Sequence, residues 1–327
     1  MGYRKHPKPT SQTDEGELKS AFSLSPIAPS PQRASSALII FAKAPIPGQV
    51  KTRLCPPLTP DEAASLHGSF VLDAIERSTF DVRRSNRYAE RSRRSLEPRT
   101  SNFVDRFVAC APSTSHVFFK IMEERHGVQL LDQIGDDLGA RMDQACNAIF
   151  ARGYQRVLVV GTDLPTLPAS FYAQALSLLS DHDLVLGPAL DGGYYLIGLR
   201  RPMPDLFVEI PWSTDQVFAL TLKKAEALGL KIGLLPAWRD VDTIDDLLAL
   251  IEEAGLGPGH EARGARPAAR GRSGTSNLEP RTSNMNPSPS PLAPSLSKRT
   301  AGVLRLLASR LHAHTSTGET KIAELNH

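Results

Sequence analysis

The sequence predicts a single α/β domain over residues 37–255, built on a mostly parallel sheet with one antiparallel insertion. The first observation is a set of short apolar runs such as Val157–Val160, which are typical of strands buried on both faces of a parallel sheet. The second is that amphipathic helical segments alternate with these runs. The third is that about 220 residues of patterned sequence suit one domain.

Strands and helices alternate along the predicted domain. The first helix has the clearest start, because Thr59 can cap it, Pro60 suits its first position and Glu62 completes a capping box. Few residues separate the fifth strand from the sixth, so we expect these two to be antiparallel neighbours. The expected strands lie at 37–42, 103–110, 128–131, 157–160, 183–188, a stretch ending at 199, and 231–235; the expected helices begin near 60, 115, 136, 168, 213 and 244.

Three polar segments interrupt or flank this domain. Residues 1–36 and 256–327 are rich in Pro and Ser and poor in apolar residues, so we expect disordered tails, the second with a possible short helix at 303–312. Residues 81–102 are predicted to be an inserted low-complexity loop, because they end in a seven-residue sequence that recurs at 278–284. We expect limited proteolysis to cut both copies first.

Composition and charge disfavour several classes of function. The formal net charge is +3 over 327 residues, which gives no case for nucleic-acid binding. No apolar stretch is long enough for a transmembrane segment, and no secretory leader precedes the first strand. The three cysteines lack metal-ligand spacing, so we expect reduced thiols. These features together predict a cytoplasmic protein.

Charged residues gather in loops that follow apolar strands, where ligands bind in an open α/β sheet. Cations after the first strand can neutralise phosphate oxygens, and a hard cation such as Mg²⁺ needs only one or two carboxylates besides phosphate and water. The loop residues are Lys43, Lys51, Arg53, Asp163, Asp191, Asp240 and Asp242. Together they suit a nucleotide diphosphate bridged by a divalent metal, although each taken singly also fits a turn, a helix cap or a solvated loop.

The motifs of other enzyme classes are missing from the sequence. No G-x-G-x-x-G or Walker pattern follows the first strand, which disfavours a dinucleotide-binding domain and a P-loop ATPase. The histidines form no H-x-x-x-H pair, and neither Ser nor Cys lies in a G-x-S-x-G elbow. A covalent hydrolase therefore has little support.

Five motifs in order carry a resemblance to one family: Phe41–Leu54, Gly161–Pro165, Asp191–Gly198, Pro211–Thr214 and Asp240–Thr243. They resemble the glycosyltransferase-like bacterial proteins called "transferase 1, radical-SAM/selenodomain-associated", within the nucleotide-diphospho-sugar transferase superfamily. The resemblance covers about residues 37–255 and implies a Rossmann-type domain with the GT-A fold. It is less specific for a reaction, because the superfamily holds both sugar and nucleotidyl transferases.

The resemblance also implies roles for the loop residues. Asp163 stands where the superfamily places a metal-binding acid, with Asp242, or less well Asp240, as the second ligand of Mg²⁺ or Mn²⁺. Asp163 and Asp191 are the predicted catalytic residues, Asp191 being a candidate base by position alone. The residues predicted to bind the phosphates or to shape the sugar and acceptor side are Lys43, Lys51, Arg53, Gly192 and Gly193.

The leading functional prediction is a metal-dependent transferase that moves a sugar from a nucleotide-diphospho-sugar to an unknown acceptor. The alternative is a nucleotidyltransferase, guanylyltransferase-like, that attacks the α-phosphate of a nucleoside triphosphate and releases pyrophosphate. A third possibility is a non-catalytic nucleotide-binding protein. Release of nucleoside diphosphate from a nucleotide sugar favours the first reaction, and release of pyrophosphate favours the second.

Overall fold

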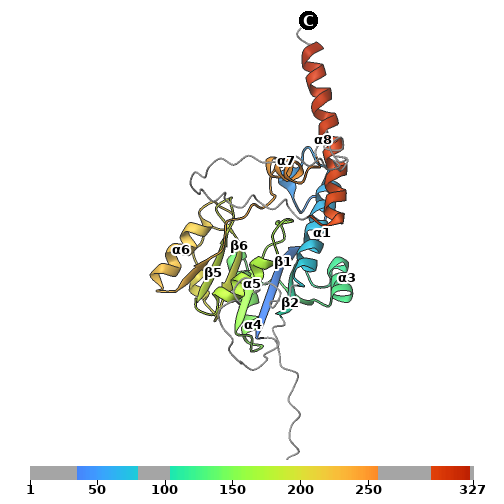
Figure 1. Ribbon diagram of the computed structural model, residues 1–327. Helices are drawn as coiled ribbons and strands as arrows, with labels where there is room; N and C mark the ends of the chain where they lie inside the picture. Colours follow the sequence, from blue (N-terminus) through green and yellow to red (C-terminus); the bar gives the residue numbers. More distant parts are fainter. Residues whose placement is uncertain (1–34, 80–103, 257–295, 325–327) are drawn as a thin grey trace, which may run out of the picture. The chain divides into compact units, whose positions relative to one another are not determined.

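The computed structural model describes residues 35–79, 104–256 and 296–324, with side chains described as far as Leu311 (Figure 1). The predicted insertion at 81–102, both copies of the repeated sequence, and nearly all of the predicted leader lie outside these residues. So does the first part of the predicted second tail. The domain boundaries therefore stay predictions.

The fold is a seven-stranded α/β sheet, which confirms the predicted class. The strands pair in the order β3-β2-β1-β4-β6-β5-β7, and β6 is antiparallel to both β4 and β5 while every other pair is parallel. The expected antiparallel insertion is thus β6. The strand bounds are β1 Ser36–Lys43, β2 Val104–Ala111, β3 Gln129–Asp132, β4 Arg156–Val160, β5 Leu184–Pro188, β6 Tyr194–Leu199 and β7 Ile232–Leu234.

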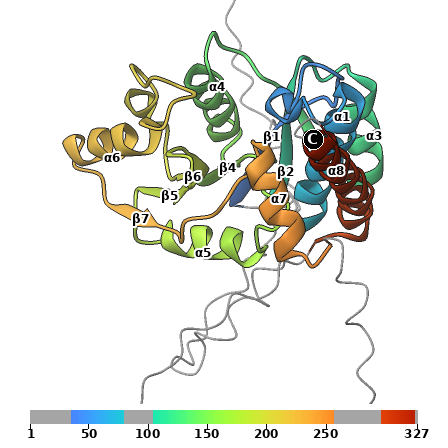
Figure 2. The same ribbon diagram turned by 90° about the horizontal axis from the view of Figure 1, so that it is seen from above.

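Helices cover both faces of the sheet (Figure 2). In β1, Leu38 and Ile40 pack into the core on one face, and Ala37 and Ile39 pack into the core on the other, as the two-residue period of a strand dictates. Because both faces of the strand are buried, its residues form one unbroken apolar run. The helices on the first face are α1 Pro60–Arg77, α3 Val117–His126 and α5 Ser170–Leu178, and those on the second are α4 Leu138–Phe150 and α6 Val217–Ala227.

The predicted capping box begins α1. The Thr59 side chain accepts a hydrogen bond from the Glu62 backbone N–H, and the Glu62 carboxylate accepts one from the Thr59 N–H. The helix predicted to begin at Ser213 instead begins at Val217. Ser213 adopts a left-handed φ of 67°, and Thr214 donates its hydroxyl to the Pro211 carbonyl, so these residues form a turn before the helix.

A third core lies beside the sheet, where α1 meets α7 Ile244–Glu253 and α8 Lys298–Glu324 (Figure 1). Leu304 and Leu307 of α8 are buried there. A buried carboxylate, Asp73, anchors the start of α8 through Arg299 at 3.1 Å and Thr300 at 2.7 Å. The expected helix at 303–312 is therefore part of a longer helix that packs on the domain.

One edge of the sheet gathers the predicted site loops, because β1, β4, β5 and β7 run in the same direction and end there. Backbone hydrogen bonds join the loops to one another. The Val241 N–H donates to the Asp163 carbonyl at 3.0 Å, and the Trp238 N–H donates to the Pro188 carbonyl at 3.0 Å. Within the described residues, no helix is long and apolar enough to cross a membrane; the predicted cytoplasmic location stays a prediction.

Candidate active site

Lys51 lies at the centre of the site, between two of the predicted acids. Its Nζ is 2.8 Å from Asp163 Oδ1 and 2.7 Å from Asp242 Oδ1, and it donates to the Val241 carbonyl at 2.6 Å. The Lys51 side chain is only 3% exposed, whereas the two carboxylates are 38% and 35% exposed. Lys51 itself has a left-handed backbone, with φ 49° and ψ 37°, at the start of a short 3₁₀ turn, Thr52–Leu54. This ammonium ties the loop after β1 to the loops after β4 and β7.

The charges in this cluster shift one another's pKa. Burial alone would lower the pKa of Lys51, but Asp163 and Asp242 outweigh it and raise that pKa above its ordinary value. Burial would likewise raise the pKa of Asp163, but the Lys51 charge and His67 hold it below its usual range. At neutral pH the cluster therefore contains a protonated lysine and an ionised Asp163.

His67 is a buried member of the cluster that the sequence analysis did not single out. Its Nε2 lies 3.1 Å from the Lys43 carbonyl oxygen, which can only accept, so Nε2 carries a proton. Its Nδ1 lies 3.6 Å from Asp163 Oδ1. The available sequence pattern was the helical spacing of Ala63, His67, Phe70 and Ala74, which places this histidine in the buried stripe of α1.

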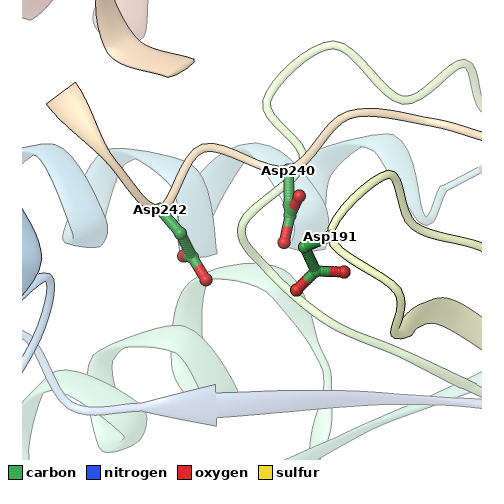
Figure 3. Close-up of side chains that lie close together, drawn as sticks. All are labelled: Asp191, Asp240 and Asp242. Carbon is green, nitrogen blue, oxygen red and sulfur yellow. The ribbon is translucent and has the colours of Figure 1, made fainter. Parts of the chain in front are cut away.

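Three carboxylates form a second acidic group next to Lys51. Oxygens of Asp191, Asp240 and Asp242 lie within 4.8 Å of one another. Figure 3 shows Asp240 and Asp242 on the loop between β7 and α7 and Asp191 on the loop between β5 and β6. Burial, together with repulsion from Asp191 and Asp242, raises the pKa of Asp240 to about 7. The group thus holds more negative charge than its surroundings compensate.

This acidic group fits a divalent cation. Carboxylate oxygens are the ligands that Mg²⁺ and Mn²⁺ prefer, and a cation among them would relieve the repulsion that raises the pKa of Asp240. Asp242 is shared with the metal pair that the resemblance implies. Asp163 lies outside the three, and its Oδ1 faces Lys51 and His67.

Two cavities meet at this cluster. The smaller, about 370 Å³, is lined by Lys43, Lys51, Arg53 and Gln133 among others, and the larger, about 550 Å³, by all three carboxylates of the acidic group. The residues lining both cavities are Phe41, Arg53, Leu138, Gly161, Asp163 and Asp242. The predicted phosphate-binding cations therefore face the smaller cavity, and Arg53 stands where the two join.

The paired glycines shape the loop that carries Asp191. Gly192 has φ +90°, and a Cβ there would overlap the backbone of Asp215, so only glycine fits without displacing that loop. The Gly192 carbonyl accepts a hydrogen bond from the Phe218 N–H at 2.9 Å. The Gly193 N–H donates to Asp191 Oδ1 at 2.9 Å and orients that carboxylate at the wall of the larger cavity.

Comparison with known proteins places this fold in a family. A family model described as "Uncharacterized protein conserved in bacteria (DUF2064)" matches residues 96–214. The structure of a "putative nucleotide-diphospho-sugar transferase" from Desulfovibrio desulfuricans G20 is 31% identical, with a TM-score of 0.58, over 71% of this chain and 91% of that one. None of the curated proteins matches significantly.

Two further solved structures show weaker likeness. CMP:2-keto-3-deoxy-manno-octonic acid synthetase complexed with CTP is 12% identical over 67% of this chain and 98% of its own, with a TM-score of 0.40. A cytidylyltransferase from Leptospira borgpetersenii serovar Hardjo-bovis is 13% identical over 68% and 87%, with a TM-score of 0.42.

The fold and the site loops thus define an α/β protein with a cavity at the carboxyl ends of its parallel strands, where ligands bind in open α/β sheets. The extent of the match to the Desulfovibrio desulfuricans protein identifies the family. The chain belongs to the nucleotide-diphospho-sugar transferase family that this protein represents.

Proposed function

We propose that the protein is a metal-dependent glycosyltransferase that uses a nucleotide-diphospho-sugar. The observation that carries the proposal is the junction of two cavities of different charge at Asp163 and Asp242, the two acids that Lys51 joins. A donor with a diphosphate between its nucleoside and its sugar suits this arrangement, because its anionic centre would lie at the junction. The finer resemblance to the radical-SAM/selenodomain-associated transferases is part of the proposal.

The smaller cavity would hold the nucleotide. Lys43 and Arg53 are exposed and line it, and neither forms an ion pair with another described residue, so both cations are available to phosphate oxygens. Gln133 has a fixed side-chain orientation there, because its Nε2 donates to the Ala42 and Ala109 carbonyls at 3.2 and 2.9 Å. The amide oxygen of Gln133 is left as an acceptor for a donor group on the nucleoside.

The acidic group would hold the cation. Asp240 and Asp242 would bind it, with Asp191 as the nearest third carboxylate, while Lys51 keeps Asp163 ionised and fixed in place. When bound, the cation would stabilise negative charge on the departing diphosphate. Asp191 Oδ1 already accepts from Gly193, so its second oxygen would accept the proton of an acceptor hydroxyl.

The test is a thermal-shift screen of nucleotide sugars and nucleoside triphosphates with and without Mn²⁺, in the native protein and in single Asp→Asn variants. Ligand binding raises the apparent melting temperature by mass action. Manganese-dependent stabilisation should weaken at least tenfold in apparent affinity in Asp242→Asn and stay unchanged in Asp205→Asn, an exposed acid that lines neither cavity. Equal stabilisation in both variants would contradict the proposal.

Two further readouts sharpen this test. Loss of the manganese effect in Asp240→Asn but not in Asp163→Asn would place the cation in the acidic group, and the reverse pattern would place it on the pair that the resemblance implies. Nucleoside diphosphate released from the stabilising nucleotide sugar supports glycosyl transfer. Pyrophosphate released from a triphosphate would overturn it in favour of nucleotidyl transfer.

A further inference from the structure

The larger cavity has an extensive apolar wall. Its apolar lining includes six residues from β1, α4, β6 and the loop before α6: Phe41, Leu138, Met142, Tyr194, Ile197 and Trp212. A phosphate gains nothing from such a wall, whereas an apolar group gains free energy in proportion to the apolar area that leaves water.

Trp212 is built into this wall by close packing. Its ring stacks on Phe207 at 6.5 Å between centroids and meets Tyr194 edge-on at 6.3 Å. The indole also lies directly against Gly139 of α4, where an added Cβ would come within 2.6 Å of indole Nε1. Three separate segments therefore hold one large aromatic side chain at the cavity, and a rigid aromatic wall binds apolar groups at low entropic cost.

The charge of the larger cavity disfavours anionic occupants. Its lining includes five aspartates, at 163, 191, 215, 240 and 242, and Arg53 as the single cation among its described lining residues. Lys51 offsets Asp163 and Asp242, but the other three acids form no ion pair with a described residue. Even with a divalent cation on the acidic group, Asp215 stays uncompensated beside the apolar wall. Of the two cations proposed to bind phosphate, Lys43 lines the smaller cavity alone.

We propose that the acceptor is an uncharged alcohol that carries an apolar group, bound with that group against Trp212, and that phosphorylated acceptors are rejected. This inference rests on the proposed function, in which the donor occupies the smaller cavity and the junction. The class of the second substrate follows from the contrast between the apolar wall and the five aspartates that line the same cavity.

The experiment uses three probes that differ by one group: phenyl β-glucoside, methyl β-glucoside and phenyl β-glucoside 6-phosphate. The reporter is Trp238→Phe, because the chain has two tryptophans and this variant leaves Trp212 as the only one. Fluorescence titration at low salt, with neither metal nor nucleotide, should give a dissociation constant at least tenfold lower for the phenyl than for the methyl glucoside. The 6-phosphate should bind at least tenfold more weakly than its neutral parent.

Variants test the apolar contact with Trp212 and the negative charge of Asp215 separately. In Trp212→Leu, titrated by calorimetry, the dissociation constant of the phenyl glucoside should rise at least fivefold, and that of the methyl glucoside should stay unchanged. Asp215→Lys should lower the ratio of the dissociation constant of the 6-phosphate to that of phenyl glucoside at least fivefold. Asp181→Lys, at an exposed acid outside the cavity, should leave this ratio unchanged. Because Asp215 is exposed, its replacement tests the charge argument even if Trp212→Leu fails to fold.

The inference is overturned if phenyl glucoside does not bind, if it binds no tighter than methyl glucoside, or if the 6-phosphate binds as tightly as its parent. Manganese-dependent stabilisation by nucleotides is measured on the same samples. If nucleotides stabilise the protein and the phenyl preference is absent, only the acceptor class is wrong. If the phenyl preference is present and no nucleotide stabilises the protein, the larger cavity binds apolar groups as inferred, but the glycosyltransferase proposal is wrong.

Discussion

Replacing Lys51 by Met should destabilise the metal-free protein and make it dependent on a divalent cation. The change removes a buried ammonium and keeps most of the apolar length of the side chain, so it leaves Asp163 and Asp242 facing each other without compensation. Removing one partner of a fully buried ion pair costs about 3–5 kcal/mol. Both carboxylates are more than a third exposed here, so water screens them and we expect a loss of about 2 kcal/mol.

Urea unfolding in EDTA measures this loss, with Lys43→Met as the matched control. Lys43 is an exposed cation at the last position of β1, just before the loop that holds Lys51, and it lines the smaller cavity without an ion pair to any described residue. Because the folded pKa of Asp163 lies below its ordinary 3.8, the ion pair contributes its full stability above that value and loses it as pH falls further. The difference between native protein and Lys51→Met should therefore shrink below about pH 4.

Manganese distinguishes electrostatics from packing. If the loss arises from two uncompensated carboxylates, millimolar Mn²⁺ should stabilise Lys51→Met more than it stabilises the native protein, because the cation can replace the ammonium. A Lys51→Met variant as stable as Lys43→Met would refute the reasoning. So would a loss that neither pH nor Mn²⁺ alters, since that would point to packing against Phe70, whose ring centroid lies 5.9 Å from the ammonium.

Three other predictions follow from the same contacts. The folded pKa of Asp240 is about 7, above its ordinary 3.8, so the metal-free protein should lose stability as pH rises from 4 to 7, and Asp240→Asn should flatten that slope in urea titrations. Gly192→Ala should lower nucleotide-sugar turnover at least tenfold, because its Cβ would displace the backbone of Asp215; Gly48→Ala, with positive φ but open space, is the control. Asp73→Ala should cost about 3 kcal/mol in urea unfolding and expose α8 to proteolysis, because it removes the buried carboxylate that binds Arg299 and leaves the buried Thr300 hydroxyl without its acceptor.

Much of the fold could be predicted because local chemistry and burial agree. The unbroken apolar run of β1 reflects a strand with cores on both faces, and the capping box at Thr59 and Glu62 satisfies the start of α1 without help from distant residues. The antiparallel pairing of β5 and β6 followed from the short connection between them. These features depend on neighbours in the sequence, and the sequence displays them directly.

The position of α8 could not be predicted, because its support comes from far along the chain. The apolar spacing of Leu304, Leu307 and Leu311 shows a helix, but a lone amphipathic helix in a polar tail is only marginally stable. Its docking depends on Asp73, which lies in α1 and reads in sequence as an ordinary polar residue of a helix. No local sequence pattern indicates that this carboxylate is buried, or that it pairs with an arginine more than 200 residues later.

For the site residues, the sequence predicts where the side chains lie but not which of them form ion pairs. Every loop residue that the sequence singled out lies at the edge of the sheet where the parallel strands end, because strand direction alone decides that edge. Strand direction does not decide which acid each cation reaches. Lys51, whose role as a phosphate ligand stays a prediction, joins Asp163 to Asp242, and the acids left without it are Asp191 and Asp240. The division into one compensated pair and one uncompensated group depends on the left-handed turn at Lys51, a backbone choice that charge patterns in the sequence do not reveal.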